Sequence, residues 1–109
     1  MRVLKFIVDG KTIRQDPSCD FTGLFPGTET SVVAEFSFSP EWKTGVKVAA
    51  FWSMMGSEYP PQELKDGKSC MIPTEALKRA AFKVQIFGKP NGVTTSTDKM
   101  TVYQRGGKA

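Results

Sequence analysis

The chain has 109 residues, of which 39% are hydrophobic and 24% are charged, and its formal net charge is +4. This length predicts one domain over residues 1–109 with a single core, and the composition excludes a disordered chain. No apolar run reaches the roughly 18 residues that a membrane-spanning helix needs, so no membrane association is expected. The mild basic excess is compatible with nucleic-acid binding but does not by itself indicate it.

The chemistry of an enzyme is hard to find in this sequence. There is no histidine, which removes Ser–His and Cys–His nucleophile pairs and His-ligated zinc. The two cysteines, Cys19 and Cys70, are too few for a structural zinc site without carboxylate ligands. Cys70 lies in an apolar segment and is expected to be a small buried hydrophobe, and whether it pairs with Cys19 is left open. We therefore expect a protein that is not an enzyme and has neither cofactor nor metal.

The first segments predict a hairpin followed by a long loop. Residues 3–8 and 11–14 flank Asp9-Gly10, a dipeptide that strongly favours a β-hairpin. Residues 15–30 follow as a loop that contains aromatic and aliphatic side chains, namely Phe21, Leu24 and Phe25. These side chains are expected to pack against the core, and a contact surface that includes Phe25 is the alternative.

Residues 31–55 predict two strands joined by a corner. In the first strand apolar residues alternate with more polar ones, which is typical of a strand buried on one face. The second run has two partly apolar faces, so it is expected to lie centrally in a sheet. The two faces are Val46, Val48, Ala50 and Trp52 on one side, and Lys47, Ala49, Phe51 and Ser53 on the other. The face with Trp52 is assigned to the core.

The second half of the chain consists of short segments separated by turn signals. Asp66-Gly67 predicts a second tight turn, and Thr74 is a candidate cap for the only helical segment, residues 74–79. Short strands are predicted at residues 62–64, 69–73, 81–88, 93–97 and 100–104. Many short strands without a long helix predict an all-β fold, either a β-sandwich or a small closed barrel.

Four aromatic residues are candidates for protein contact. Trp42, in the corner after Pro40, is expected to close one end of the core, and an exposed anchor for a partner is the alternative. Phe51 and Phe87 are assigned to the outer faces of their strands, where they would form a surface apolar patch typical of a protein contact. Phe25 completes this set. For single-stranded nucleic acid, the candidate residues are Lys47, Lys83 and Phe87.

Several segments follow one another in a recognisable order. They are Ala34-Glu35-Phe36-Ser37-Phe38-Ser39, Glu41-Trp42, Lys47-Val48-Ala49-Ala50-Phe51, Asp66-Gly67, Ile72-Pro73-Thr74-Glu75-Ala76-Leu77, Phe82-Lys83-Val84-Gln85-Ile86-Phe87-Gly88 and Thr94-Thr95. Through them, residues 31–104 resemble small immunoglobulin-like β-sandwich modules of tailed phages and prophages, which occur in tail, baseplate or adhesion assemblies. The resemblance implies an antiparallel sandwich of about seven strands with one short helical turn. It supplies no catalytic or ligand residues.

The resemblance also implies a function. It suggests a non-enzymatic structural module, encoded by a phage or prophage, that acts through protein–protein contacts with other virion proteins or as a homo-oligomer. Such a protein would be made in the cytoplasm of the host bacterium, in agreement with an N-terminus that enters a strand-like run directly, and would take a place in the virion. The alternative is a small β-barrel protein that binds single-stranded nucleic acid.

Overall fold

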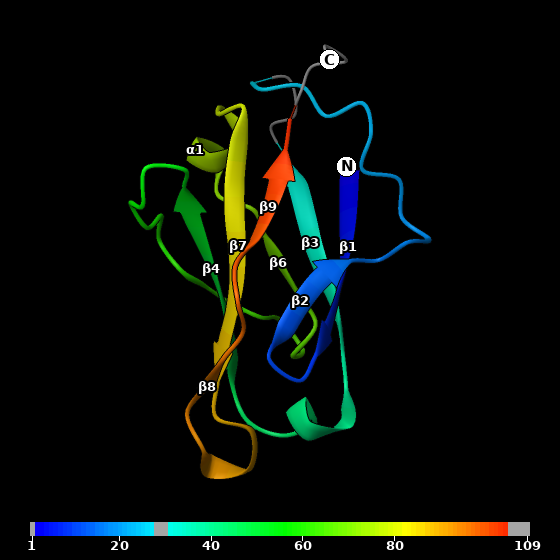
Figure 1. Ribbon diagram of the computed structural model, residues 1–109, viewed down its shortest axis with the longest axis vertical. Coiled ribbons are helices and arrows are strands. Elements are labelled where there is room, and N and C mark those ends of the chain that lie inside the picture. The colour runs from blue at the N-terminus through cyan, green and yellow to red at the C-terminus, as the bar shows by residue number, and fades with distance from the viewer. Residues whose placement is uncertain (1, 28–30, 105–109) are drawn as a thin grey trace.

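Two sheets dominate the computed structural model, which describes residues 2–27 and 31–104 (Figure 1). One sheet has four strands in the order β2-β1-β3-β6, and the other has five, in the order β5-β4-β7-β8 with β9 also paired to β7. The strands are β1 (Arg2–Asp9), β2 (Thr12–Gln15), β3 (Val32–Phe38), β4 (Lys47–Ser53), β5 (Gln62–Glu63), β6 (Ser69–Met71), β7 (Ala81–Gly88), β8 (Thr95–Ser96) and β9 (Met100–Tyr103). Helical turns occur at η1 (Pro40–Trp42), α1 (Thr74–Leu77) and η2 (Pro90–Gly92). The mostly-β prediction is confirmed, with nine strands in the described residues instead of about seven.

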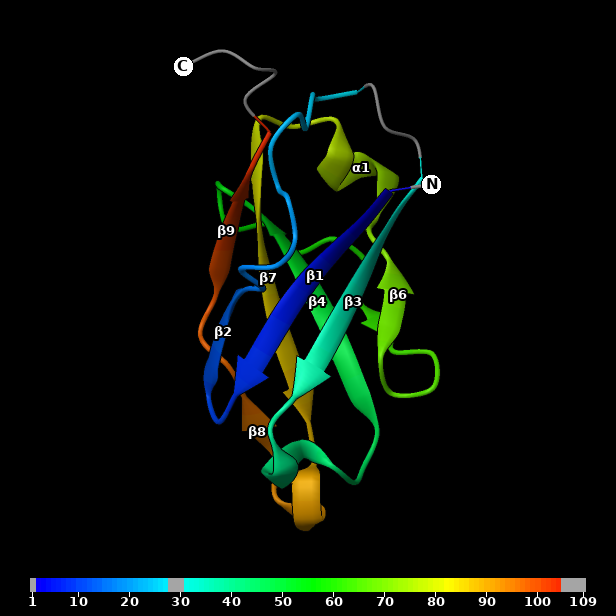
Figure 2. The same ribbon diagram turned by 90° about the vertical axis from the view of Figure 1, so that its right-hand side faces the viewer.

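The N-terminal strand pairs in two different ways. It forms the predicted hairpin with β2, although the loop is Gly10–Lys11, because Asp9 still pairs with Thr12 as a strand residue. On its other side β1 runs parallel to β3, with Phe6 opposite Phe36, and Figure 2 shows the two strands side by side and pointing the same way. The prediction of a fully antiparallel arrangement is therefore wrong. The long segment between β2 and β3 makes the parallel pair possible, since it returns the chain to the starting end of the sheet.

This segment packs as expected in its described part. The ring of Phe21 meets that of Phe6 edge-on, with centroids 5.4 Å apart, and Leu24 is buried. The Arg2 guanidinium donates hydrogen bonds to the carbonyl oxygens of Asp20 and Thr22, which fastens the segment to the start of β1. Phe25 is the exception, being 41% exposed. Residues 28–30 of the predicted loop lie outside the described residues.

The core lies between the two sheets. Phe6 and Phe36 stack at a centroid distance of 5.2 Å on one side, and Phe51 meets Phe82 on the other. The main inward residues are Leu4, Phe6, Val8, Val32, Ala34 and Phe36 from one sheet, and Ala49, Phe51, Phe82, Val84, Ile86 and Val102 from the other. The inward face predicted for β7 is thus confirmed. The faces of β4 are the reverse of the prediction, because Phe51 is fully buried whereas Trp52 lies on the outer face.

The short connections depend on specific backbone and side-chain contacts. The predicted turn before β6 is present, and Asp66 and Gly67 both have positive φ angles, of 54° and 68°. Thr74 is not the cap of α1, whose N-cap is Pro73 without a side-chain hydrogen bond. Instead, the buried Gln104 amide holds the end of this helix, since its Nε2 donates to the carbonyl oxygens of Leu77 and Arg79 at 3.0 and 2.8 Å.

The two cysteines are both free thiols. Cys70 is buried in β6 opposite Ala34, as expected for a small hydrophobe. Burial raises the pKa of the Cys70 thiol to about 12, because the charged thiolate is poorly solvated there. A thiol with so high a pKa is a poor nucleophile at neutral pH.

Candidate protein-contact face

Trp42 closes one end of the core, just before the segment that leads into the candidate contact face. The side chain is 1% exposed, and its Nε1 donates a 2.7 Å hydrogen bond to the carbonyl oxygen of Gly10 in the β1–β2 loop. On the other sheet, Gly88 leaves space for the ring, since an added Cβ would lie 3.1 Å from Trp42 Cζ3. Trp42 therefore joins the two sheets. Its predicted role in closing the core is confirmed, and the alternative of an exposed anchor is wrong.

The chain reaches β4 through a close approach between two backbones. Gly45 has a φ of 92°, and a Cβ at this position would lie 2.7 Å from the carbonyl oxygen of Lys89. Only glycine combines this conformation with this proximity at low cost. The contact brings Val46 beside the end of β7, where it is 64% exposed.

An apolar groove follows on the outer face of the five-stranded sheet. Val48 in β4 lies directly opposite Phe87 in β7, and Val46 extends the same surface. We call the hollow the outer groove; it has a volume of about 410 Å³ and is lined by Val46, Val48, Phe87, Gly88, Lys89 and Thr94. Phe87 thus lies on the outer face, as predicted. Phe51, which was predicted to join it, is 0% exposed and contributes nothing to this surface.

Farther along the same face, Trp52 lies opposite Lys83. Its Nε1 donates a 3.2 Å hydrogen bond to Gln85 Oε1, and the Lys99 ammonium lies 3.9 Å from the ring centroid, within cation–π range. Gln85 in turn donates to the carbonyl oxygen of Thr97 at 2.8 Å. The outer face therefore combines an apolar groove at one end with an aromatic ring and lysine side chains toward the other.

The remaining sequence candidates do not join this face. Lys47 is directed inward and is 7% exposed, with its ammonium 5.3 Å from the Phe38 ring. The three predicted nucleic-acid residues therefore do not form one surface, since only Lys83 and Phe87 share the outer face. Phe25 lies in a segment whose Gly27 N–H donates a hydrogen bond to the carbonyl oxygen of Leu77 in α1. This segment is at the opposite end of the molecule from η2 (Figure 1).

Sequence reasoning missed Val46, Trp52, Lys89 and Lys99 as members of this face. The alternation of β7 is unambiguous, because Lys83 and Gln85 face away from Phe82 and Val84. The pairing of β4 with β7 decides the faces of β4. Trp52 lies opposite Lys83 and therefore shares the outer face with it. The pattern of β4 does not indicate the register of this pairing, because both of its faces are apolar and no tight turn joins it to β7.

Comparison with known proteins adds no further evidence, since no family model, curated protein or solved structure matches the chain. Within residues 2–27 and 31–104 there is no group of three or more metal-ligating side chains. No helix in these ranges has the length and hydropathy required to cross a membrane. The function must therefore be inferred from the geometry of the surface.

Proposed function

We propose that the chain is a non-enzymatic binding module that contacts another protein through the outer face of its five-stranded sheet. The outer groove carries this proposal. Val46 is 64% exposed beside Val48 and Phe87, so apolar side chains meet water together at the mouth of a hollow. A contiguous apolar patch rimmed by polar residues is typical of a protein-contact site.

The charges beside the groove indicate the kind of partner. Lys89 lines the groove, and Lys83 and Lys99 lie farther along the same sheet. Complementary charge selects partners at an interface, so the fitting surface presents apolar side chains flanked by aspartate or glutamate. Two copies joined through this face would bring these lysines together, which favours a different protein over a second copy. The homo-oligomer expected from the sequence remains a prediction and would use another surface.

The immunoglobulin-like character and the phage or prophage setting rest on the resemblance of residues 31–104. In that setting the partner is another virion protein, and the module contributes a contact surface to an assembly. The two-sheet arrangement is compatible with a sandwich of this type.

Single-stranded nucleic acid is the less favoured occupant of the same face. Stacking of bases requires free aromatic rings. One face of the Trp52 ring is already covered by the Lys99 ammonium, and Lys47 lies inside the molecule. The arrangement around Trp52 therefore favours a protein contact.

The test places a photo-reactive phenylalanine analogue at Val46, with Met71, which is 42% exposed on the other sheet, as the matched control position. Mass spectrometry identifies the cross-linked protein from cells that contain the chain. The purified partner is then titrated with the wild-type chain and with the variants Val46→Glu and Lys89→Glu. We expect cross-links from position 46 only, and about tenfold weaker binding for each variant, since each introduces an acidic side chain at the interface.

Three outcomes would contradict the proposal. One is equal cross-linking from positions 46 and 71. Another is unchanged affinity of the purified partner for Val46→Glu. The third is recovery of nucleic acid at position 46, with affinity that falls steeply as salt rises, which would favour the alternative function.

A further inference from the structure

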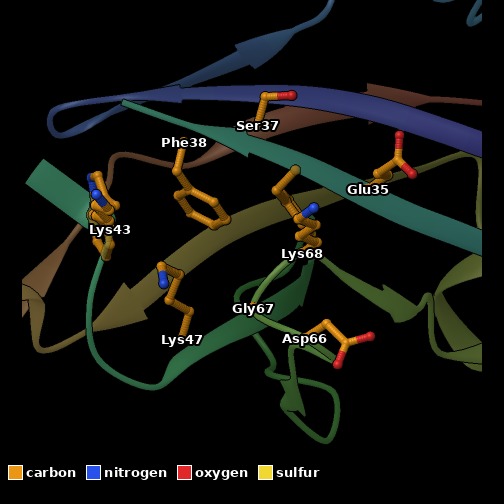
Figure 3. A pocket seen from close by; sticks show the side chains of 10 residues that line it. Glu35, Ser37, Phe38, Lys43, Lys47, Asp66, Gly67 and Lys68 are labelled. Atoms are coloured by element: carbon orange, nitrogen blue, oxygen red, sulfur yellow. The ribbon is translucent and has the colours of Figure 1, made fainter. Parts of the chain in front are cut away.

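A second hollow lies on another side of the molecule, where the two sheets separate near the start of β4 (Figure 3). We call it the β3–β4 cleft; it has a volume of about 490 Å³, and its lining includes Glu35, Phe38, Lys43, Lys47, Asp66 and Lys68. The cleft exists because the edge strands are short. β6 pairs with β3 only over Val33–Glu35, and β5 pairs with β4 only at Val48 and Ala49.

Lys47 is the unusual residue of this cleft. Only 7% of this residue is exposed, although its side chain ends in a charged ammonium group. The ammonium donates one hydrogen bond to the carbonyl oxygen of Gly45 at 3.3 Å and lies 5.3 Å from the Phe38 ring. In the described part of the chain, no carboxylate lies within ion-pair distance of it. An ammonium has three donors, and a buried charge without a counter-charge is costly.

Two more lysines bring positive charge to the same cleft. Figure 3 shows Lys43, Lys47 and Lys68 arranged around the ring of Phe38, on three different segments of the chain. Neither Lys43 nor Lys68 forms an ion pair within residues 2–27 and 31–104. The acidic residues of the lining do not neutralise them. Glu35 pairs with Lys5 at 3.9 Å on the outer face of the other sheet, and Asp66 is directed away from the lysines (Figure 3).

We propose that the β3–β4 cleft binds an organic oxyanion, a carboxylate or a phosphate monoester attached to a flat apolar group. The anion lies beside the ammonium group of Lys47, whose free donors form charge-assisted hydrogen bonds with it, and Lys43 and Lys68 add positive charge at the lining of the cleft. The apolar group packs against the half-buried ring of Phe38, which forms one wall of the cleft. This site is separate from the outer groove and does not depend on the function proposed for it.

The test is a titration of the isotope-labelled full chain, followed by the NMR shifts of backbone amides. The probes are phenyl phosphate, phenylacetate and inorganic phosphate, with benzyl alcohol as the neutral control. We expect saturable shifts at Lys47, Gly67 and Lys68 with at least one of the two aromatic anions, and weaker binding of inorganic phosphate and benzyl alcohol. Saturation by phenyl phosphate alone identifies a phosphate monoester as the ligand class, and saturation by phenylacetate alone identifies a carboxylate.

Matched variants separate this site from general charge attraction. Lys47→Met keeps most of the apolar stem and removes the charge, so binding should weaken about tenfold. Lys78→Met removes the same charge beside α1, where Lys78 pairs with the exposed Glu75, and should leave binding unchanged. The double variant Lys43→Met with Lys68→Met alters only exposed positions and should also weaken binding, which keeps the test valid if Lys47→Met does not fold.

Several outcomes would overturn the proposal. One is the absence of saturable shifts with both aromatic anions. Another is equal binding by wild type, Lys47→Met and the double variant. The third is a similar loss of binding in Lys78→Met, which would show that the anions respond only to the net charge of the protein.

Discussion

Two regions of the molecule use tryptophan in different ways. At the end of the molecule, Trp42 is enclosed by both sheets and bonds to a backbone carbonyl in the β1–β2 loop. On the outer face of the five-stranded sheet, Trp52 remains partly exposed and contacts the side chains of Gln85 and Lys99. The first ring packs between the two sheets, whereas the second contacts side chains on the outer face of one sheet. Burial at one site serves stability, whereas at the other the aromatic side chain stays partly exposed on the proposed contact face.

The largest expected effect tests this difference directly. Trp42→Ala should lower the free energy of unfolding by about 3–5 kcal/mol, as for a buried large-to-small change. Trp52→Ala should cost about 1–2 kcal/mol, because it removes one cation–π contact and one side-chain hydrogen bond. Urea denaturation of both variants measures the two values. Similar losses at the two positions would show that the proposed contrast is wrong.

A second pair of variants tests how tightly the end near Trp42 is packed. Gly45 and Gly56 have nearly the same φ, 92° and 95°, so alanine introduces similar backbone strain at both. Only at Gly45 does the new Cβ meet the Lys89 carbonyl oxygen, at 2.7 Å, whereas nothing lies within 4 Å at Gly56. Gly45→Ala should therefore lose about 1–3 kcal/mol more than Gly56→Ala. Equal losses measured by denaturation would mean that the backbones separate at little cost.

The smallest expected effect concerns pH. Glu41 lies beside Trp42 in η1. Its carboxylate accepts hydrogen bonds from the Ser39 side chain and from the backbone N–H of Glu41 itself, and these bonds lower the pKa of Glu41. In the loop after β2, bonds from the Ser18 backbone and side chain lower the pKa of Asp16, and bonds from the Thr22 side chain and backbone lower that of Asp20. Each carboxylate thus stabilises the folded chain above its unfolded pKa, and this contribution is lost as pH falls through the lower, folded value.

We therefore expect the melting temperature to fall slightly below about pH 4. The protection factor of the Trp42 indole N–H, which is corrected for the intrinsic pH dependence of exchange, should fall at acidic pH, whereas that of Trp52 should change less, because none of these carboxylates contacts it. NMR exchange measurements on both signals make the comparison. The variant Glu41→Gln should reduce the pH dependence at Trp42. An equal loss of protection at both tryptophans would indicate global opening in place of a local effect.

The sequence predicts strands well where one face is clearly apolar. In β7, Phe82, Val84 and Ile86 alternate with polar residues, and the structure buries the expected set. In β4 both faces are apolar, so alternation alone does not distinguish Phe51 from Trp52. The deciding information is the pairing of β4 with β7, which places Trp52 opposite Lys83. Because both faces of β4 are apolar and no tight turn joins β4 to β7, the hydrophobic pattern of β4 does not fix this register.

The candidate sites were predictable to different degrees. Phe87 was assigned correctly to the outer face from the alternation of its own strand. Val46 and Lys89 meet at the outer groove only because Gly45 approaches the Lys89 backbone, a contact between segments far apart in sequence. The lysines of the β3–β4 cleft likewise come from η1–β4 and from the turn before β6. These side chains come together only through tertiary packing, so no sequence motif marks either site.

The parallel pairing of β1 with β3 has a consequence for the time course of folding. Residues 2–8 of β1 each pair with a residue thirty positions later, as Leu4 with Ala34 and Phe6 with Phe36. Closing this interval costs chain entropy before the two phenylalanine rings can stack. Neighbouring antiparallel strands carry a smaller cost, so the β1–β3 pair forms against a higher barrier than the β1–β2 hairpin. The β1–β2 hairpin is therefore expected to form before the parallel pair, and during synthesis on the ribosome the first strand has no parallel partner until β3 has been made.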